Sequence, residues 1–208
     1  MKMIPDLICD WDGTLCDSIP NSFRGTCEVF MKCNLPPPTL ADYIANFGPP
    51  FVDFYRKRGV PHSVSEAQIG DWYYAKADHH TCELFDDVFP VICHQRSYGS
   101  KVALVTSQRQ PIIEHLLEKL RCTSLFDVVI CDALPDKAPH FVKACGMMRV
   151  KPEKVYCIGD FASDMIAAKV AGTIPIGIMR YDRSVSDILY RAGAARVITR
   201  LRDLIIKF

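Results

Sequence analysis

The chain has 208 residues with 25 basic and 24 acidic side chains, and its formal net charge is +1. Hydrophobic residues make up 49% of the sequence, which is enough for a sizeable core and excludes a disordered chain. The balanced charge argues against a nucleic-acid-binding or membrane-surface protein, so we expect neither nucleic acid nor membrane as a partner. This length suits one large domain, or a domain that carries a smaller inserted one.

The ten cysteines form no C-x-x-C pair, so the sequence does not indicate a zinc ribbon or a thioredoxin-like motif. Several of them lie inside apolar runs and are expected to be reduced core residues. The opening MKMIPDLICDWDGT has no signal-peptide hydrophobic region, and no stretch approaches the roughly 18 apolar residues of a membrane span. We therefore expect a cytoplasmic protein, either a monomer or a homodimer.

Short apolar segments alternate with helix-like stretches along most of the chain. The apolar segments read as continuous hydrophobic runs, which is the pattern of parallel strands buried on both faces. Their alternation with helices predicts an α/β fold with a doubly wound parallel sheet. The expected strands are residues 4–9, 101–106, 127–131, 154–159, 173–178 and 195–199. The expected helices between them are residues 111–121, 138–148, 164–172 and 185–194.

Residues 17–87 interrupt this alternation, because they contain no convincing buried strand. Three stretches within them, 21–33, 51–59 and 65–85, read as amphipathic helices, and the prolines at 36–38 mark a break between two of these. The sequence therefore predicts an inserted all-helical domain at 17–87. The α/β core would consist of residues 1–16 and 88–208.

Two carboxylates follow the first expected strand, in the stretch CDWDGT. Residues i and i+2 of an extended segment point to the same side, so Asp10 and Asp12 would face one ligand while Trp11 faces the other way. Like charges this close repel each other unless a cation or a proton intervenes. Gly13 would let the backbone turn sharply and leave N–H groups free for an anion. A solvated strand end with an ordinary turn is the alternative interpretation.

The ends of three later strands also carry polar residues, and ligands of parallel α/β sheets bind beyond the carboxyl ends of strands. Thr106 and Ser107 precede a helix, where hydroxyl and N–H groups favour a phosphate, although an ordinary helix cap would look the same. Lys137 lies in the loop after the third strand and would matter only if it points at an anion. Asp160 and Asp164 form a second acidic pair, which suits a hard cation such as Mg²⁺ or merely caps a helix.

Taken together, the four strand ends resemble the motifs of the haloacid dehalogenase-like (HAD) hydrolase superfamily. The matches are DWDGT, the Thr106 of ALVTS, Lys137, and GDFASD. The helical insertion, the turn at Gly48-Pro49 and the C-terminal GAARVITRLRDLI are similar to the phosphoglycolate-phosphatase-like branch, which carries a helical cap. The resemblance covers nearly the whole chain and implies a Rossmann-like core with an inserted cap.

The resemblance implies a Mg²⁺-dependent phosphatase that acts on a small phosphorylated metabolite through an aspartyl-phosphate. Asp10 would be the nucleophile, and Asp12 would protonate the leaving oxygen and then deprotonate the attacking water. The metal would be held by Asp10, the backbone carbonyl of Asp12, Asp160 and Asp164.

The phosphoryl oxygens would be held by Thr106, Ser107, Lys137 and the backbone at Gly13. The third motif commonly reads Lys-Pro-x-Pro, whereas this chain has Asp136-Lys137-Ala138-Pro139. We prefer Lys137 for that role, with Lys143 and Lys151 as weaker candidates.

Other interpretations remain open at this stage. A phosphomutase or phosphotransferase of the same superfamily would use the same motifs, and a receiver-type phospho-accepting signalling module also uses acidic residues, a Thr and a Lys at strand ends. Within the insertion, Arg56, Lys57 and Arg58 could bind an anionic substrate tail, but a solvated helix face is the simpler expectation. The His79-His80 pair is expected on an exposed helix surface. Trp72, Tyr73 and Tyr74 are expected in the core of the insertion.

Overall fold

The computed structural model describes residues 4–182 and 185–205. These contain a sheet of six parallel strands in the order β3-β2-β1-β4-β5-β6. Every strand lies inside a predicted range, so the predicted doubly wound α/β fold is confirmed. The strands are β1 (Asp6–Cys9), β2 (Val102–Val105), β3 (Val128–Ile130), β4 (Val155–Gly159), β5 (Ile174–Ile178) and β6 (Arg196–Ile198).

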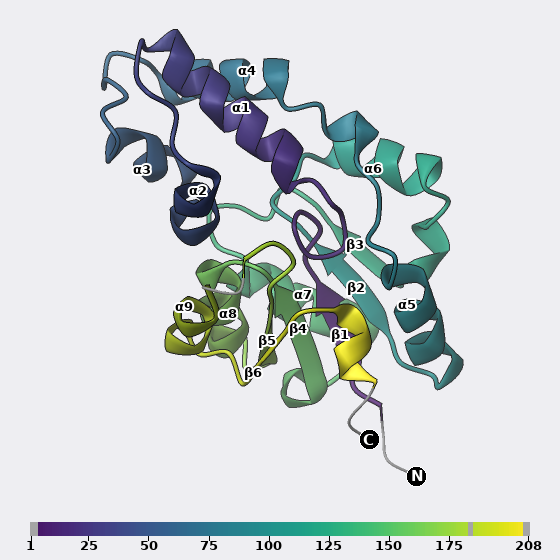
Figure 1. The fold of residues 1–208 in the computed structure, drawn as a ribbon. Coiled ribbons are helices and arrows are strands. Elements are labelled where there is room, and N and C mark those ends of the chain that lie inside the picture. The colour runs from purple at the N-terminus through teal and green to yellow at the C-terminus, as the bar shows by residue number, and fades with distance from the viewer. Residues whose placement is uncertain (1–3, 183–184, 206–208) are drawn as a thin grey trace.

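Helices cover both faces of the sheet (Figure 1). Successive strand residues point to opposite faces, so Leu7 and Cys9 of β1 pack with α5 and α6, whereas Ile8 packs with α7 and α8. This is why the strands have apolar residues at consecutive positions rather than at alternate ones. The helices of this part are α5 (Val88–Ser97), α6 (Gln110–Lys119), α7 (Ala138–Met148), α8 (Ala162–Val170) and α9 (Ser186–Ala192). Short 3-10 helices add η2 (Thr123–Leu125), η3 (Pro152–Lys154) and η5 (Leu201–Leu204).

A separate helical unit lies beyond the carboxyl ends of the strands (Figure 1). It has its own aromatic core, in which Phe30, Tyr43, Phe54 and Tyr55 are almost completely buried. We define the helical unit as α1 (Ile19–Lys32), α2 (Leu40–Asn46), α3 (Phe51–Arg56), α4 (Glu66–Lys76) and η1 (His79–Thr81).

In this unit one prediction was wrong, and one helix was not predicted. The stretch 65–85 is not one helix, because α4 ends at Lys76 and a 3-10 turn follows it. Helix α2 was not predicted, although Thr39 accepts a hydrogen bond from the Asp42 N–H at 3.1 Å and so marks its start as a helix cap.

The chain enters and leaves the helical unit through two segments that pair with each other. The Asp17 N–H donates to the Glu83 carbonyl at 2.8 Å, and the Phe85 N–H donates to the Leu15 carbonyl at 3.0 Å. Arg180, just beyond β5, donates to the Thr14 carbonyl at 3.0 Å and forms an ion pair with Asp87 at 3.0 Å. These contacts hold the two connecting segments immediately beside the loop that follows β1.

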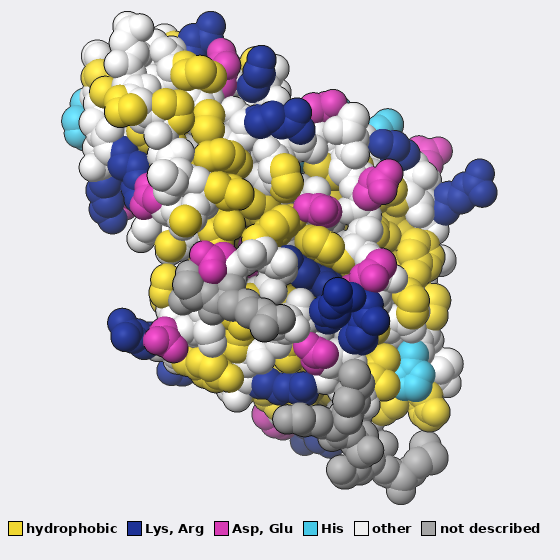
Figure 2. Space-filling view, in the orientation of Figure 1, with side chains coloured by type: hydrophobic (Ala, Val, Ile, Leu, Met, Phe, Trp, Pro, Cys, Tyr) yellow, Lys and Arg dark blue, Asp and Glu magenta, His cyan; other side chains and the backbone are white. Residues whose placement is uncertain are grey.

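Figure 2 shows acidic and basic side chains interspersed over one face of the molecule, in keeping with the net charge of +1. Hydrophobic side chains are visible where the helical unit meets the sheet-bearing part. Within residues 4–182 and 185–205, the helices are too short or too polar to cross a membrane.

Candidate active site at the carboxyl edge of the sheet

Three strand ends meet at one ammonium group. The Nζ of Lys137 lies 2.8 Å from Oδ1 of Asp10, which follows β1, and 2.8 Å from Oδ1 of Asp164 in the first turn of α8. All three side chains are at most 9% exposed. A buried ion pair of this kind requires close geometry, because each charge has lost its hydration. The expected convergence of these residues is therefore present in the structure.

The charges in this cluster shift one another's pKa values. Burial raises the pKa of Asp10 to about 7; Lys137 opposes this increase, and Asp164 adds to it. Burial also raises the pKa of Asp160 well above its ordinary range, reinforced by the charges of Asp10 and Asp164. Burial alone would lower the pKa of Lys137, but the two carboxylates outweigh it and raise that pKa. One ammonium thus faces more carboxyl groups than it can neutralise.

Asp10, Asp160 and Asp164 each offer one oxygen, and the three oxygens lie within 4.8 Å of one another. An all-oxygen donor set with excess negative charge suits a hard divalent cation. The two acidic residues of the GDFASD motif, Asp160 and Asp164, differ in how many of their carboxylate oxygens already have partners. Both oxygens of Asp164 are engaged, with Lys137 and with the Phe161 N–H at 3.1 Å. Asp160 accepts a long contact of 3.4 Å from the Thr14 hydroxyl and a hydrogen bond from its own backbone N–H. Asp160 is thus the freer of the two to bind a cation.

The loop after β1 folds back on itself and leaves two consecutive N–H groups unpaired within the described part of the chain. The carbonyl of Trp11 accepts the N–H groups of Leu15 and Cys16, at 3.0 and 2.9 Å. Among the described residues, the N–H groups of Trp11 and Asp12 have no hydrogen-bond acceptor. Trp11 itself is fully buried in the core, on the side away from the carboxylates, as expected.

Gly13 differs from the expectation in one respect. Its N–H donates to the Cys16 carbonyl at 3.0 Å and is therefore not free for an anion. Gly13 is required for two other reasons. Its φ of +72° favours glycine, and a Cβ atom there would lie 2.3 Å from Oδ2 of Asp160. The N–H groups left free are those of Asp12 and Trp11, which come one and two residues before Gly13 in the sequence.

The second strand end presents Thr106 and Ser107. Thr106 is buried, and its hydroxyl oxygen accepts the Gln108 N–H at 3.1 Å, which leaves the hydroxyl proton available. The Ser107 hydroxyl instead donates to the Ala133 carbonyl at 3.3 Å. The Ser107 N–H has no acceptor among the described residues. The backbone of Ser107, rather than its side chain, is the group free to meet an anion.

Three residues around Asp12 were not foreseen in this role. Gln108 donates to Oδ2 of Asp12 at 3.4 Å and accepts from the Tyr74 hydroxyl at 3.3 Å. The His79 ring lies on the other side, with Nδ1 3.9 Å from Oδ1 of Asp12. The predicted exposed surface for His79 was wrong, since this side chain is only 2% exposed. Its neighbour His80 is exposed, as expected. The helix break after Lys76, which turns His79 inward, carries no strong sequence signal.

The aromatic residues of α4 divide between two environments. Trp72 and Tyr73 pack against the core of the helical unit, as predicted. Tyr74 instead faces the sheet-bearing part, where the guanidinium of Arg109 lies 3.8 Å from its ring centroid. Consecutive helical residues point about 100° apart, which explains why the three do not share one face.

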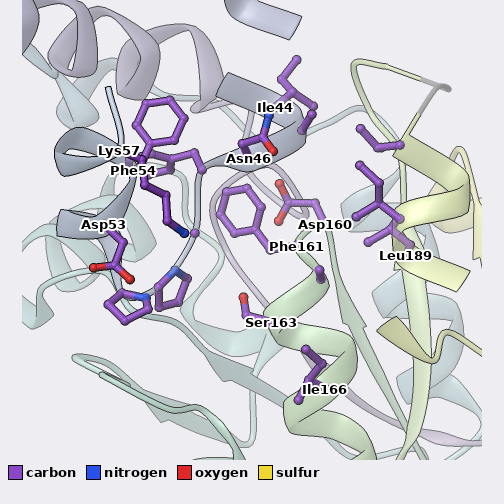
Figure 3. Close-up of a pocket in the computed structure, with 18 of the residues that line it drawn as sticks. Ile44, Asn46, Asp53, Phe54, Lys57, Asp160, Phe161, Ser163, Ile166 and Leu189 are labelled. Carbon is purple, nitrogen blue, oxygen red and sulfur yellow. The ribbon is translucent and has the colours of Figure 1, made fainter. Parts of the chain in front are cut away.

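A cavity of about 590 Å³ opens between the helical unit and the start of α8, with Asp160 in its wall. Figure 3 shows Phe54 and Lys57, from α3 and its end, on one side, and Asp160, Phe161 and Ser163 on the other. This volume is within the range of small-molecule sites.

The three basic residues at 56–58 have different surroundings. Arg56 donates to the Val64 carbonyl at 2.7 Å, and Arg58 forms a 2.6 Å ion pair with Asp42, so both have structural partners. The Lys57 ammonium lines the cavity and has no ion pair with any described residue. Lys143 and Lys151, the weaker candidates for the third motif, are exposed and outside the cluster.

Comparison with known proteins agrees with this geometry. The family described as "Haloacid dehalogenase-like hydrolase" matches residues 7–178. Phosphoglycolate phosphatase of Vibrio parahaemolyticus is 26% identical over 184 residues, covering 81% of this chain and 81% of the relative. Pyrophosphatase PpaX of Bacillus cereus is 27% identical over 179 residues, covering 82% of this chain and 81% of the relative.

Among solved structures, a hydrolase from Pseudomonas syringae has a similar fold. The TM-score is 0.80 at 20% identity, and the alignment covers 98% of this chain and 97% of that one. The similarity therefore extends over the helical unit as well as the sheet.

Proposed function

The chain belongs to the haloacid dehalogenase-like hydrolases, and we propose that it is a Mg²⁺-dependent phosphatase acting on small phosphomonoesters. The observation that carries the proposal is the meeting of Asp10, Lys137 and Asp164 within 2.8 Å contacts at the ends of separate strands. The relatives named phosphoglycolate phosphatase and pyrophosphatase PpaX support phosphoryl transfer as the reaction. In this proposal, residues 17–87 form the cap over a core of residues 1–16 and 88–208.

The first step is attack by a carboxylate oxygen of Asp10 on phosphorus. An O–P bond to Asp10 forms as the bond from phosphorus to the ester oxygen breaks, and Asp12 gives its proton to that leaving oxygen. The Lys137 ammonium, 2.8 Å from Asp10, orients the nucleophile and offsets the charge of the incoming phosphate.

The second step returns the enzyme to its starting state. Asp12, now ionised, takes a proton from water, whose oxygen attacks phosphorus and displaces Asp10. Inorganic phosphate leaves, and Asp12 has recovered its proton. The phosphoryl oxygens would be bound in both steps by the N–H groups of Trp11, Asp12 and Ser107, together with the Thr106 hydroxyl.

The carboxylates of Asp10 and Asp160 and the Asp12 carbonyl would hold the metal, with Asp164 close by. Bound Mg²⁺ would supply charge neutralisation between the Asp10 carboxylate and the phosphate dianion. The chain's own contribution is an oxygen-rich cluster with one ammonium against several carboxyl groups.

The leaving group would occupy the cavity between the helical unit and α8. Its volume of about 590 Å³ suits a small metabolite rather than a polymer. Lys57 lies in that wall and has no ion pair within residues 4–182 and 185–205, so a leaving group that carries a carboxylate or a second phosphate is favoured. A cytoplasmic location would provide such metabolites.

The test is phosphate release from p-nitrophenyl phosphate, 2-phosphoglycolate, pyrophosphate and simple alkyl phosphates, with and without Mg²⁺. We expect release that requires Mg²⁺ and that falls by at least 10³-fold in Asp10→Asn, because the nucleophile is lost. Asp71→Asn is the matched control, since Asp71 is exposed on α4 and the substitution is chemically identical. Full activity of Asp10→Asn would refute the aspartyl-phosphate mechanism.

The role of Asp12 is tested with the same panel. In Asp12→Asn, the rate of the first step, which releases the leaving group, should fall far more for an alkyl phosphate than for p-nitrophenyl phosphate. An alkoxide is a poor leaving group and needs the proton from Asp12, whereas p-nitrophenolate does not. Equal losses in that step would refute the assignment of Asp12 as the acid.

A further inference from the structure

His79 lies at the junction between the helical unit and the active site. It begins η1, immediately before the chain returns to the sheet, and its side chain is 2% exposed. A buried imidazole normally has a partner on each ring nitrogen, because a buried polar group without a hydrogen bond is costly to the folded state. The two nitrogens of His79 differ in this respect.

The Nε2 atom has a partner within the helical unit, the Tyr73 hydroxyl at 3.3 Å. Among the described residues, the buried Nδ1 atom has no hydrogen-bond partner, although the Cys82 thiol lies against the ring. Oδ1 of Asp12 is also buried, has no hydrogen-bond partner within residues 4–182 and 185–205, and lies 3.9 Å from that nitrogen. Two unsatisfied polar atoms of complementary type therefore face each other, about 1 Å beyond hydrogen-bond distance.

The hydrogen bond to Tyr73 also bears on which nitrogen carries the proton. When the Tyr73 hydroxyl donates to Nε2, the neutral ring carries its proton on Nδ1, directed at Asp12. The other carboxyl oxygen of Asp12 already accepts from Gln108 at 3.4 Å. A small rotation of Asp12 would place one donor on each of its oxygens and fix the plane of the carboxyl group.

We propose that His79 is a positioning residue whose Nδ1–H holds Asp12 in the orientation needed for proton transfer. The proposal rests on the proposed function of Asp12 as acid and base. Hydrogen bonds at catalytic groups are often long in ligand-free structures and shorten in the substrate complex. The helical unit would thus contribute an orienting group to the reaction in addition to a wall of the cavity.

The first measurement is an NMR long-range ¹H–¹⁵N correlation of the imidazole rings, which needs no turnover. We expect a proton on Nδ1 of His79 in the wild type and a shifted or lost signal in Asp12→Ala. The Cys82 thiol also contacts this ring, so Cys82→Ala is the control and should retain the signal. An unprotonated Nδ1, or a signal that depends on Cys82 and not on Asp12, would overturn the proposal.

The second measurement compares two amide substitutions. His79→Asn places an N–H donor near the position of Nδ1, whereas His79→Gln places its amide near Nε2. We expect His79→Gln to lower kcat for an alkyl phosphate by about 10- to 100-fold with KM within about twofold, and His79→Asn to retain most of kcat. His80→Ala, at the exposed neighbour, should leave both constants unchanged.

A purely structural role for His79 would lower the thermal midpoint of both amide variants and would not distinguish them in kcat. Equal kcat losses in His79→Asn and His79→Gln would therefore overturn the proposal. Absence of phosphate release from every ester by the wild type would instead refute the proposed function, and the NMR result would still decide whether His79 binds Asp12.

Discussion

Replacing Lys137 with Met would test whether the ammonium is what allows the carboxyl groups to be buried together. Methionine has a similar length and no charge, so it removes the cation with little change in volume. At 2.8 Å and an effective dielectric constant of about 20, each carboxylate contact represents roughly 6 kcal/mol of gross Coulomb attraction. Desolvation offsets much of this, and loss of one partner of a buried pair typically costs about 3–5 kcal/mol.

The cost should depend on pH with a defined sign. The folded-state pKa of Asp10 is about 7, above its ordinary value of 3.8, so in metal-free protein this group makes stability fall as pH rises from about 4 to about 7. Without the charge of Lys137 that pKa rises further, and the decline extends to higher pH. We expect Lys137→Met to lose about 3–5 kcal/mol at pH 8 and clearly less at pH 5, where Asp10 is protonated in both proteins.

The assay is urea unfolding in EDTA at pH 5 and pH 8, followed by circular dichroism, with the slopes compared as well as the midpoints. Lys143→Met is the matched control, because Lys143 is exposed on α7, and its effect should stay within about 0.5 kcal/mol at both pH values. A loss below about 1 kcal/mol at pH 8, or the same loss at both pH values, would refute the reasoning.

Three further predictions concern other parts of the chain. Lys57→Met should raise KM for 2-phosphoglycolate by about tenfold and leave KM for p-nitrophenyl phosphate within about twofold, because only 2-phosphoglycolate carries a carboxylate on the part that leaves. Lys32→Met is the control in steady-state kinetics. Burial opposes the change, but hydrogen bonds from the Val102 N–H and from Arg96 lower the pKa of Asp127 below its ordinary value of 3.8. In urea unfolding, Asp127→Asn should therefore cost about 1 kcal/mol at pH 7, and this cost should shrink as the pH falls below that ordinary value. Gly25→Ala should lower the free energy of unfolding by about 1–3 kcal/mol in thermal unfolding, because the added Cβ would lie 2.8 Å from the backbone oxygen of Tyr73 in α4. Gly70→Ala is the control and should be neutral or stabilising, because a Cβ at that position of α4 faces open space.

The part of the site that the sequence predicted is the part carried by strand ends. Asp10, Lys137 and Asp164 follow buried strands of a parallel sheet, and the parallel arrangement brings such residues to one edge regardless of loop detail. Continuous apolar runs identified those strands without ambiguity. Backbone hydrogen bonds in the loop were harder to predict from the sequence. Whether the Gly13 N–H donates to the Cys16 carbonyl depends on how tightly the loop folds.

The contribution of the helical unit was less predictable for a related reason. His79 faces Asp12 only because α4 stops at Lys76 and a 3-10 turn rotates the next residues inward. The stretch after Lys76 contains neither proline nor glycine to mark that stop. Whether a histidine in such a stretch is exposed or buried depends on the packing of α4 against α1, which is a tertiary property.

The two segments by which the chain enters and leaves the helical unit lie closer in the hydrogen-bond network to the proposed acid, Asp12, than to the proposed nucleophile, Asp10. Asp12 forms an isolated β-bridge with Cys16. Cys16 forms a second one with Leu84, in the segment by which the chain leaves the helical unit. Asp10 instead continues the β1 ladder, where its N–H donates to the Ile158 carbonyl at 2.9 Å. A shift of the helical unit that admits substrate would therefore act first on the surroundings of Asp12, while the pairing of Asp10 with Lys137 stays fixed by the sheet. In this arrangement the proposed nucleophile, Asp10, is preorganised by the core, and the proposed acid, Asp12, would be aligned only when the helical unit is in place over the substrate.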